Sequence, residues 1–366
     1  MTAGGDVVEV APVRSGEELP WERLAAYLRP RLDALGLDVV GELSVLQFPN
    51  GSANLTYLLS FGDSRFVLRR PPFGQIAPGA HDMRREHRVL SSLWQAFDRA
   101  PRAYVFCDDH EVVGSDFVVA EYRSGEVVWG ALPESMRALS DAGRRLGLAT
   151  VDALAELHMV DPARCALEGL GRPDGYLLRQ VDGWRTRWGL VATPEVDATM
   201  TAAGDLLART MPSSPRPAIL HNDFKLDNCQ FLPGLPDRVV SVFDWDQATL
   251  GDPFADLGTL LNYWPDPGDT PDDQALTVPG LAEIGLPGRV EVVDRYAVRT
   301  GADVSDLAWY EAFACWKTAV VCQQLWQRYV RGESTDDRMA SRGDHVGSLA
   351  LRALRIARSR TAAGPA

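Results

Sequence analysis

The chain has 366 residues, 46% hydrophobic and 24% charged, a composition that is ordinary for a globular protein of two domains or lobes. Its net charge of -13 excludes the basic footprint of a nucleic-acid-binding protein. No run approaches the roughly 18 apolar residues of a membrane span, and the acidic N-terminal segment does not resemble a signal peptide. The five cysteines form no C-x-x-C pair, which predicts free thiols and a cytoplasmic location.

The first third of the chain predicts a small antiparallel sheet. After a loose tail, apolar residues at helical spacing predict a helix over 21–37. The period then changes to that of strands, with turn residues between them. The pattern predicts about five strands, with one helix (79–97) inserted after the third; the strands are expected at 43–48, 56–61, 64–70, 103–109 and 115–122.

From residue 134 onward the pattern is mainly helical. Two short apolar pieces, 218–223 and 238–246, predict buried strands that lead into polar loops. Helices are expected over 139–160, 175–192, 198–211, 254–264, 303–332 and 345–358. The fold class is therefore α+β, with a small antiparallel β lobe that carries one helix and a larger, mainly helical lobe.

The two polar loops carry residues suited to phosphoryl transfer. Residues 220–228, LHNDFKLDN, contain H-x-D-x-K-x-x-N, and in the segment 242–246, VFDWD, Asp244 lies 16 positions after Asn228. This chemistry needs a carboxylate for the acceptor hydroxyl, hard oxygen ligands for Mg²⁺, and a cation on the transferred phosphoryl group. Asp223 fits the first role, Asn228 with Asp244 the second, and Lys225 the third.

These stretches, with FPNGSANLTYLL (48–59), FVLRRPP (66–72) and CWKTAVVCQQLWQRYVRG (315–332), resemble a known family. The chain looks like an aminoglycoside phosphotransferase/choline kinase-like phosphotransferase, and is most similar to the kinase-like domains associated with acyl-CoA dehydrogenases. The resemblance runs from about residue 40 to about 340. It implies a bilobal protein-kinase-like fold and the cofactors ATP and Mg²⁺.

The resemblance also assigns roles and ranges. Asp223 matches the catalytic aspartate, and Asn228 and Asp244 match the metal ligands. His221 would pack beneath the catalytic loop, and Asp256 would tie that loop down; whether Asp246 or Asp252 touches a second metal stays open. The implied domains are an N-terminal tail and helix (1–36), a nucleotide-binding β lobe (37–123), and a helical lobe with catalytic loop, metal site and acceptor pocket (124–366).

Nucleotide binding rests on subtler features, because the chain lacks both G-x-G-x-x-G and the P-loop motif. The turn that contains Gly51, Ser52 and Asn54 is expected to cover phosphates. No lysine is available on the third strand, so Arg69 should pair with Glu86, with Arg70 as the alternative register. Adenine is expected against the strand that ends near 121–123, with the segment Glu121, Tyr122 and Arg123 at its edge.

The acceptor is the least determined partner. The resemblance points to a hydroxylated acyl substrate, such as a hydroxyacyl-CoA or a hydroxy acid. The alternative enzyme is an aminoglycoside or macrolide antibiotic kinase, because the acidic segment 265–273 would suit a polycationic acceptor. The alternative from another class is a catalytically silent nucleotide-binding scaffold. The expected partners are ATP and a small hydroxyl acceptor, without nucleic acid or membrane. Aromatic and basic candidates for the acceptor pocket are Tyr176, Arg179, Trp184, Trp188, Tyr263 and Trp264.

Overall fold

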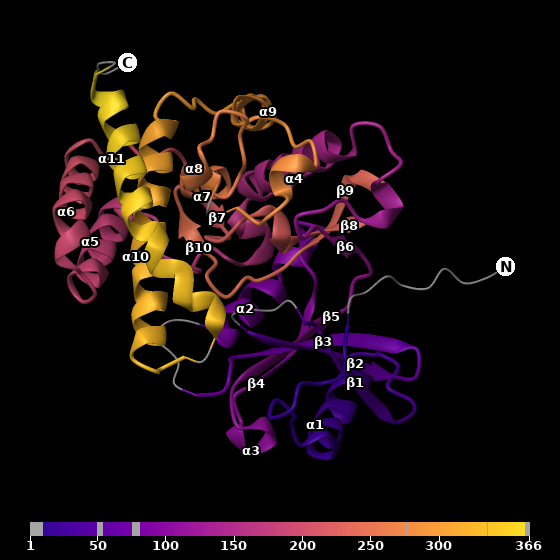
Figure 1. Ribbon diagram of the computed structural model, residues 1–366. Helices are drawn as coiled ribbons and strands as arrows, with labels where there is room; N and C mark the ends of the chain where they lie inside the picture. Colours follow the sequence, from indigo (N-terminus) through magenta and orange to yellow (C-terminus); the bar gives the residue numbers. More distant parts are fainter. Residues whose placement is uncertain (1–9, 50–53, 75–80, 275–276, 335, 363–366) are drawn as a thin grey trace. The chain divides into compact units, whose positions relative to one another are not determined.

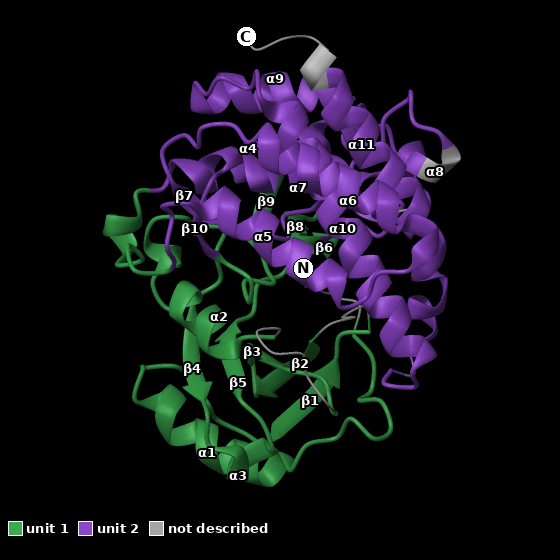
Figure 2. Ribbon diagram, turned by 90° about the vertical axis from the view of Figure 1, so that its left-hand side faces the viewer, with its two compact units in different colours: residues 1–127, 161–170, 228–248 green, residues 128–160, 171–227, 249–366 purple. Residues whose placement is uncertain are grey.

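The structure is a computed structural model that describes residues 10–49, 54–74, 81–274, 277–334 and 336–362. It divides into two compact units (Figure 2). Unit 1 comprises Met1–Val127, Asp161–Leu170 and Asn228–Ala248, and unit 2 comprises Val128–Val160, Gly171–Asp227 and Thr249–Ala366. Residues 228–248 therefore belong to the same compact unit as the β-rich first part of the chain. The roles predicted for the ranges 1–36, 37–123 and 124–366 stay predictions.

Unit 1 contains the predicted antiparallel sheet of five strands, in the order β1-β2-β3-β5-β4 (Figure 1). The strands are β1 (Leu43–Gln47), β2 (Leu55–Phe61), β3 (Ser64–Arg70), β4 (Ala103–Cys107) and β5 (Phe117–Glu121). Two helices lie between β3 and β5 along the chain, α2 (Met83–Leu90) and the short α3 (His110–Val113). The helix predicted over 79–97 is shorter, because the Asp82 side chain caps it by accepting from the Arg85 N–H at 2.9 Å.

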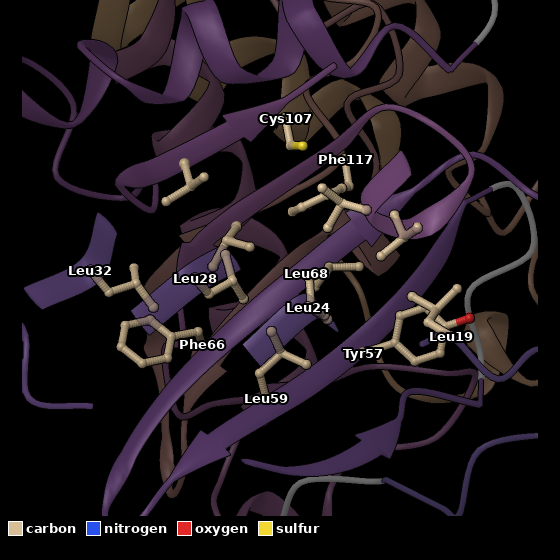
Figure 3. Packing of buried hydrophobic residues seen from close by; sticks show 14 of the residues in the cluster. Leu19, Leu24, Leu28, Leu32, Tyr57, Leu59, Phe66, Leu68, Cys107 and Phe117 are labelled. Carbon is tan, nitrogen blue, oxygen red and sulfur yellow. The ribbon is translucent and has the colours of Figure 1, made fainter. Parts of the chain in front are cut away.

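One face of this sheet is covered by α1 (Trp21–Asp33). Leu24, Leu28 and Leu32 recur every four residues and therefore form one apolar stripe along the helix. Figure 3 shows this stripe packed on Phe66 and Leu68 of β3 and on their neighbours. The helix ends at Asp33 rather than near residue 37, and Pro30 lies inside its last turn without dividing it.

A second, three-stranded sheet of unit 1 has the order β6-β8-β9. It is formed by β6 (Glu126–Val127), β8 (Cys229–Leu232) and β9 (Leu235–Val242). Of these strands only β9 was expected from the sequence. Its predicted range, 238–246, starts and ends later than the observed strand. The hairpin of β8 and β9 brings two polar segments, one before β8 and one after β9, to the same end.

Unit 2 is mainly helical, as predicted, and the α+β fold class is confirmed. Its short strands β7 (Ala218–Leu220) and β10 (Thr249–Gly251) pair antiparallel. On α7, Gly258 lets α10 approach closely, because a Cβ there would lie 2.7 Å from the Tyr310 carbonyl oxygen. The helices are α4 (Ala142–Met159), α5 (Tyr176–Gly189), α6 (Pro194–Arg209), α7 (Phe254–Asn262), α8 (Pro271–Gln274), α9 (Arg289–Thr300), α10 (Leu307–Val330) and α11 (Val346–Ala362), of which α8 and α9 were not predicted. Within the described residues, no helix has the length and apolar character needed to cross a bilayer.

Candidate functional site

A buried ion pair joins the sheet of unit 1 to α2. Side chains alternate along β3, so Phe66 and Leu68 face α1 while Arg69 faces the other side. There the Arg69 Nε lies 2.8 Å from the Glu86 Oε1, with side-chain exposures of 12% and 1%. Arg70 lies on the α1 side and donates to the Val113 carbonyl oxygen at 3.3 Å. The pair is therefore formed by Arg69, as the sequence predicts, and not by Arg70.

Two further carboxylates act on Arg69. Asp244 accepts a hydrogen bond from its guanidinium, and Asp246 acts through its charge. Burial opposes the charge of Arg69, but the three carboxylates outweigh it and raise the pKa of Arg69 above its ordinary value. Burial also raises the pKa of Glu86 to about 7, against the lowering effect of Arg69. Three acidic groups thus share one cation, and this local excess of negative charge suits a divalent cation.

The predicted metal ligands Asn228 and Asp244 meet at one end of the β8–β9 hairpin. Cys229 pairs with Val242 in register, and the next residue, Phe243, donates its N–H to the Asn228 carbonyl oxygen at 3.1 Å. Asp244 has a φ of 75°, a left-handed conformation that is uncommon outside glycine and is concentrated at functional sites.

These two oxygen donors fit magnesium in its usual protein setting. Mg²⁺ requires hard oxygen ligands, and it commonly binds through one or two side chains together with phosphates and water. In the part of the chain that the structure describes, no group of three or more His, Cys, Asp or Glu side chains is arranged to hold a metal ion alone. Asn228 and Asp244 as Mg²⁺ ligands stay a prediction.

The predicted phosphate-covering turn is described only at its last residue. Gly51 and Ser52 lie outside the described residues. The Asn54 Nδ2 donates to the Asp246 Oδ2 at 3.2 Å, and the Asn54 Oδ1 lies 2.8 Å from the His81 Nδ1. Asp246 is 6% exposed, so it is a buried, hydrogen-bonded carboxylate rather than a solvated loop residue.

The segment predicted to contact adenine is held by its own side chains. The Glu121 carboxylate accepts from the Arg102 backbone N–H at 3.1 Å and from Arg123 at 2.9 Å. Arg123 also donates to the carbonyl oxygens of Ala100 and Val240, each at 3.0 Å. The Tyr122 ring lies under the Arg65 guanidinium, 4.5 Å from centroid to carbon. The backbone that follows β5 is thus fixed in unit 1, while its contact with adenine stays a prediction.

In unit 2, the predicted catalytic loop begins directly after β7 and is anchored by Asp256. This fully buried carboxylate on α7 accepts from the backbone N–H groups of His221 at 2.6 Å and Asn222 at 2.7 Å. Asn222 has a φ of 66°, and its side chain accepts from the Tyr176 hydroxyl at 2.9 Å. The buried His221 ring accepts from the Asp223 N–H at 3.3 Å. These contacts fix the backbone that presents Asp223, as the resemblance implied for Asp256 and His221.

The anchor continues into α4 through His158 and into α9 through Tyr296, and the sequence did not indicate these contacts. The His158 Nε2 lies 3.4 Å from the Asp256 Oδ2, and the His158 Nδ1 lies 2.7 Å from the Tyr296 hydroxyl. Burial disfavours the Asp256 charge, but His158 and His221 outweigh it and hold the pKa of Asp256 below its ordinary value. Asp252, in contrast, accepts from the Tyr310 hydroxyl at 2.7 Å and the Phe254 N–H at 3.0 Å, so it closes the turn before α7.

Lys225 lies beside Asp223, as the two-residue spacing predicts. Its Nζ is 3.4 Å from the Asp223 Oδ2 and 3.7 Å from the Asp227 Oδ2. The same ammonium lies 5.6 Å from the centroid of the Tyr263 ring. Burial raises the pKa of Asp227, although Lys225 acts in the opposite direction. Lys225 is therefore part of the loop's charge arrangement and not a freely solvated lysine.

The six acceptor-pocket candidates divide into two groups. Tyr176 and Tyr263 contact the catalytic loop, and Trp184 contacts Lys317, which also reaches the loop. The other three serve packing: Trp188 donates to Asp197, the buried Trp264 donates to the Pro287 carbonyl oxygen, and Arg179 binds the carbonyl oxygens of Arg172 and Asp174.

A model of the phosphotransferase enzyme family matches residues 44–290, more than half of the chain. The chain belongs to this family. The predicted phosphotransferase class is thereby confirmed, and Asp223 and the other loop residues described above lie inside the matched range of the family.

Known members and relatives agree with this assignment. Mouse acyl-CoA dehydrogenase family member 10 is 29% identical over 347 residues, which cover 94% of this chain and 32% of the mouse protein. The chain spans less than half the length of the family members 10 and 11 that it matches. A Ralstonia eutropha protein assigned to the aminoglycoside phosphotransferases has a TM-score of 0.76 and 29% identity, covering 93% of this chain and 99% of its own. Aminoglycoside phosphotransferase APH(4)-Ia, in complex with AMP-PNP and hygromycin B, shares the fold at a TM-score of 0.56 and 17% identity, covering 93% and 99%.

Proposed function

We propose that this phosphotransferase moves the γ-phosphoryl group of ATP, bound with Mg²⁺, to a hydroxyl group of a small hydroxylated acid or its coenzyme A thioester. The observation that carries the proposal is the anchored loop of unit 2. It presents Asp223 with Lys225 only 3.4 Å away, on a backbone fixed by the two hydrogen bonds to Asp256. This is the pair of a carboxylate and a cation that phosphoryl transfer to a hydroxyl requires.

Each residue has a chemical task in this proposal. Asp223 accepts a hydrogen bond from the acceptor's hydroxyl group, orients its oxygen and receives its proton as the new P–O bond forms and the bond between the γ-phosphorus and the ADP oxygen breaks, which releases ADP. Lys225 holds negative charge on the transferred group. Arg69, positioned by Glu86, binds phosphate oxygens. Asn228 and Asp244 would hold Mg²⁺, which supplies charge compensation to the phosphates when bound.

The nucleotide assignment rests on unit 1 and on a neighbour. The neighbour APH(4)-Ia binds AMP-PNP, an ATP analogue, together with a small acceptor. The buried Arg69–Glu86 pair and the oxygen donors at the end of the β8–β9 hairpin support the same ligand here. We infer that the backbone after β5 binds the adenine edge, since the Glu121 and Arg123 side chains hold that segment in place.

A hydroxy acid or its thioester is preferred over an aminoglycoside because of the acidic segment 265–273. A polycation would need carboxylates that are available to it. Of the carboxylates in this segment whose side chains the structure describes, Asp266 accepts from the Arg289 N–H at 2.7 Å, Asp269 forms a two-bond pair with the Arg289 guanidinium at 2.6 and 2.7 Å, and Asp273 pairs with Arg352 and Arg355. The kinship with acyl-CoA dehydrogenase family members supports the acyl class.

The test is an ATP-consumption assay with direct detection of phosphorylated product. The panel contains straight-chain hydroxy acids, their coenzyme A thioesters, kanamycin and a macrolide. We expect turnover with an acid or thioester, and none from Asp244→Ala, whereas Asp205→Asn on α6 should match the wild type. Turnover with kanamycin alone would select the antibiotic kinase, and ATP binding without any turnover would select the silent scaffold.

A further inference from the structure

The second lysine of the chain also lies at the catalytic loop. The chain contains 37 basic residues, yet only Lys225 and Lys317 are lysines. Lys317, on α10, donates from its Nζ to the Asn222 carbonyl oxygen at 3.3 Å, directly before Asp223 in the chain. The same Nζ lies 5.7 Å from the centroid of the Trp184 ring on α5. Residues 95 positions apart are thus brought together beside the proposed catalytic carboxylate.

Lys317 is a partly buried cation whose ammonium contacts a backbone carbonyl rather than a carboxylate in the part of the chain that the structure describes. Among the described residues it forms no ion pair, in contrast to Arg69, which pairs with Glu86, and Arg352, which pairs with Asp273. An ammonium has three donors, and the Asn222 carbonyl uses one of them. Burial lowers the pKa of Lys317, although the charges of Asp223 and Asp256 act in the opposite direction. Because burial outweighs these carboxylates, a bound anion close to the ammonium would offset part of the cost of burying its charge.

A second cation contacts the same aromatic ring. The Arg187 guanidinium carbon lies 4.3 Å from the Trp184 ring centroid, and Arg187 also lowers the pKa of Lys317. Arg187 forms no ion pair within the described part of the chain, whereas its neighbour on α5, Arg185, pairs with Asp205. Two positive charges therefore flank one tryptophan near Asp223, in a chain whose net charge is -13. An anion would satisfy both at once.

We propose that Lys317 and Arg187 bind an anionic group of the acceptor while its hydroxyl is held at Asp223. This rests on the proposed function and narrows its acceptor class. The anion is either the free carboxylate of a hydroxy acid or a phosphate of a coenzyme A thioester, since an ammonium and a guanidinium recognise both. Two cations at this position repel a polycationic acceptor, so they also select against aminoglycosides.

The competing role for Lys317 is to position the loop through its bond to the Asn222 carbonyl oxygen. The two roles differ in what a substitution changes. A positioning residue alters kcat for every acceptor, because the loop carries Asp223 in all cases. An anion-binding residue alters KM and equilibrium affinity, and only for acceptors that carry the anion.

The experiment compares Lys317→Met, Lys317→Arg and Arg187→Gln, with Arg185→Gln as the control that removes an already paired charge from α5. Acceptors are hydroxy acids, their neutral methyl esters and their coenzyme A thioesters. Binding is also measured by calorimetry with hexanoate, hexanamide and hexanoyl-CoA, which carry no hydroxyl group and need no turnover. Arg187 is exposed, so its variant reports on binding even if Lys317→Met fails to fold.

We expect Lys317→Met to raise KM and Kd for the anionic ligands by roughly 10- to 100-fold, as for loss of a hydrogen bond to a charged group. Lys317→Arg should recover part of this affinity, Arg187→Gln should lose about 3- to 10-fold, and Arg185→Gln should stay within about twofold. Loss confined to acids assigns the carboxylate, and loss confined to thioesters assigns the phosphate.

Equal losses for acids and methyl esters, or a fall in kcat with unchanged KM and Kd, would overturn the proposal and leave Lys317 as a positioning residue. Unchanged hexanoate and hexanoyl-CoA binding in Lys317→Met and Arg187→Gln would also overturn it. These outcomes differ from failure of the proposed function, in which the wild-type enzyme phosphorylates no member of the panel.

Discussion

Asp256→Asn should be among the most damaging single substitutions in unit 2. The wild-type carboxylate is fully buried and accepts two backbone N–H groups, from His221 and Asn222. An asparagine keeps one acceptor oxygen and turns an NH₂ group toward the other N–H donor. The change removes one charge-assisted hydrogen bond, about 1.5–3 kcal/mol, and leaves a buried donor unsatisfied, about 1–3 kcal/mol. We expect the free energy of unfolding to fall by about 3–5 kcal/mol.

The measurement is denaturant unfolding followed by tryptophan fluorescence, since seven of the ten tryptophans lie in unit 2. The matched control is Asp205→Asn, whose carboxylate is 48% exposed and pairs with Arg185, so its loss should cost less than about 1 kcal/mol. If Asp256→Asn unfolds within about 1 kcal/mol of wild type, the anchoring of the catalytic loop by Asp256 is refuted.

The same substitution has a pH signature. The pKa of Asp256 in the folded protein lies below its ordinary value of 3.8. Its ionised form therefore contributes stability that is fully present above that ordinary value and is lost as the pH falls through the folded pKa. The stability difference between wild type and Asp256→Asn should be constant near neutral pH and shrink below about pH 4. A difference that grows on acidification would contradict the assigned sign.

Three further substitutions test the proposed roles by steady-state kinetics and binding. Asp223→Asn should lower kcat by orders of magnitude and leave ATP affinity within a few-fold; the reverse pattern would make Asp223 structural. Lys225→Ala should lower kcat by about 10²- to 10³-fold with little change in KM for ATP, and Lys225→Arg should rescue it only in part. A kcat of Lys225→Ala within about twofold of wild type would remove it from the site. Arg69→Met should destabilise unit 1 by about 3–5 kcal/mol by leaving Glu86 unpaired, and Arg69→Met/Glu86→Leu should regain stability without ATP binding; equal stability of both variants would contradict this.

Local periodicity predicted most of the fold because the decisive contacts follow from short patterns. The alternation along 64–70 places Arg69 on the face opposite Phe66 and Leu68, and the stripe of Leu24, Leu28 and Leu32 defines α1. The strands β6 and β10 were missed because they contain only two and three residues, which is too short to show the alternation of apolar and polar side chains that marks a strand. Helix α9 was missed although it is longer, since its buried residues are only Val292 and Tyr296.

The polar loop that follows β7 was predictable because its residues are adjacent in sequence, whereas its supports are not; its catalytic role stays a prediction. His158 and Tyr296 are 138 positions apart, and their contact depends on how α4 packs on α9. The only sequence signal for Lys317 is that lysine is rare in this chain. No local sequence pattern predicts that a residue of α10 contacts Asn222. Asp252 and Asp256 lie four residues apart; the resemblance singled out Asp256 as the loop anchor, and the hydrogen bonds show that Asp252 instead closes the turn before α7.

The discontinuity of unit 1 constrains how this protein is made. Its β6-β8-β9 sheet joins residues 126–127 to strands that end at Val242, and Arg123 donates to the Val240 carbonyl oxygen. About two thirds of the chain must therefore be synthesised before all the residues of unit 1 are available to fold together. Until then, the β strands made first have edge backbone groups that are not hydrogen-bonded to other strands. A fragment cut at Val127 would lack Asn228 and Asp244, so no single truncation yields unit 1 alone with its proposed metal ligands.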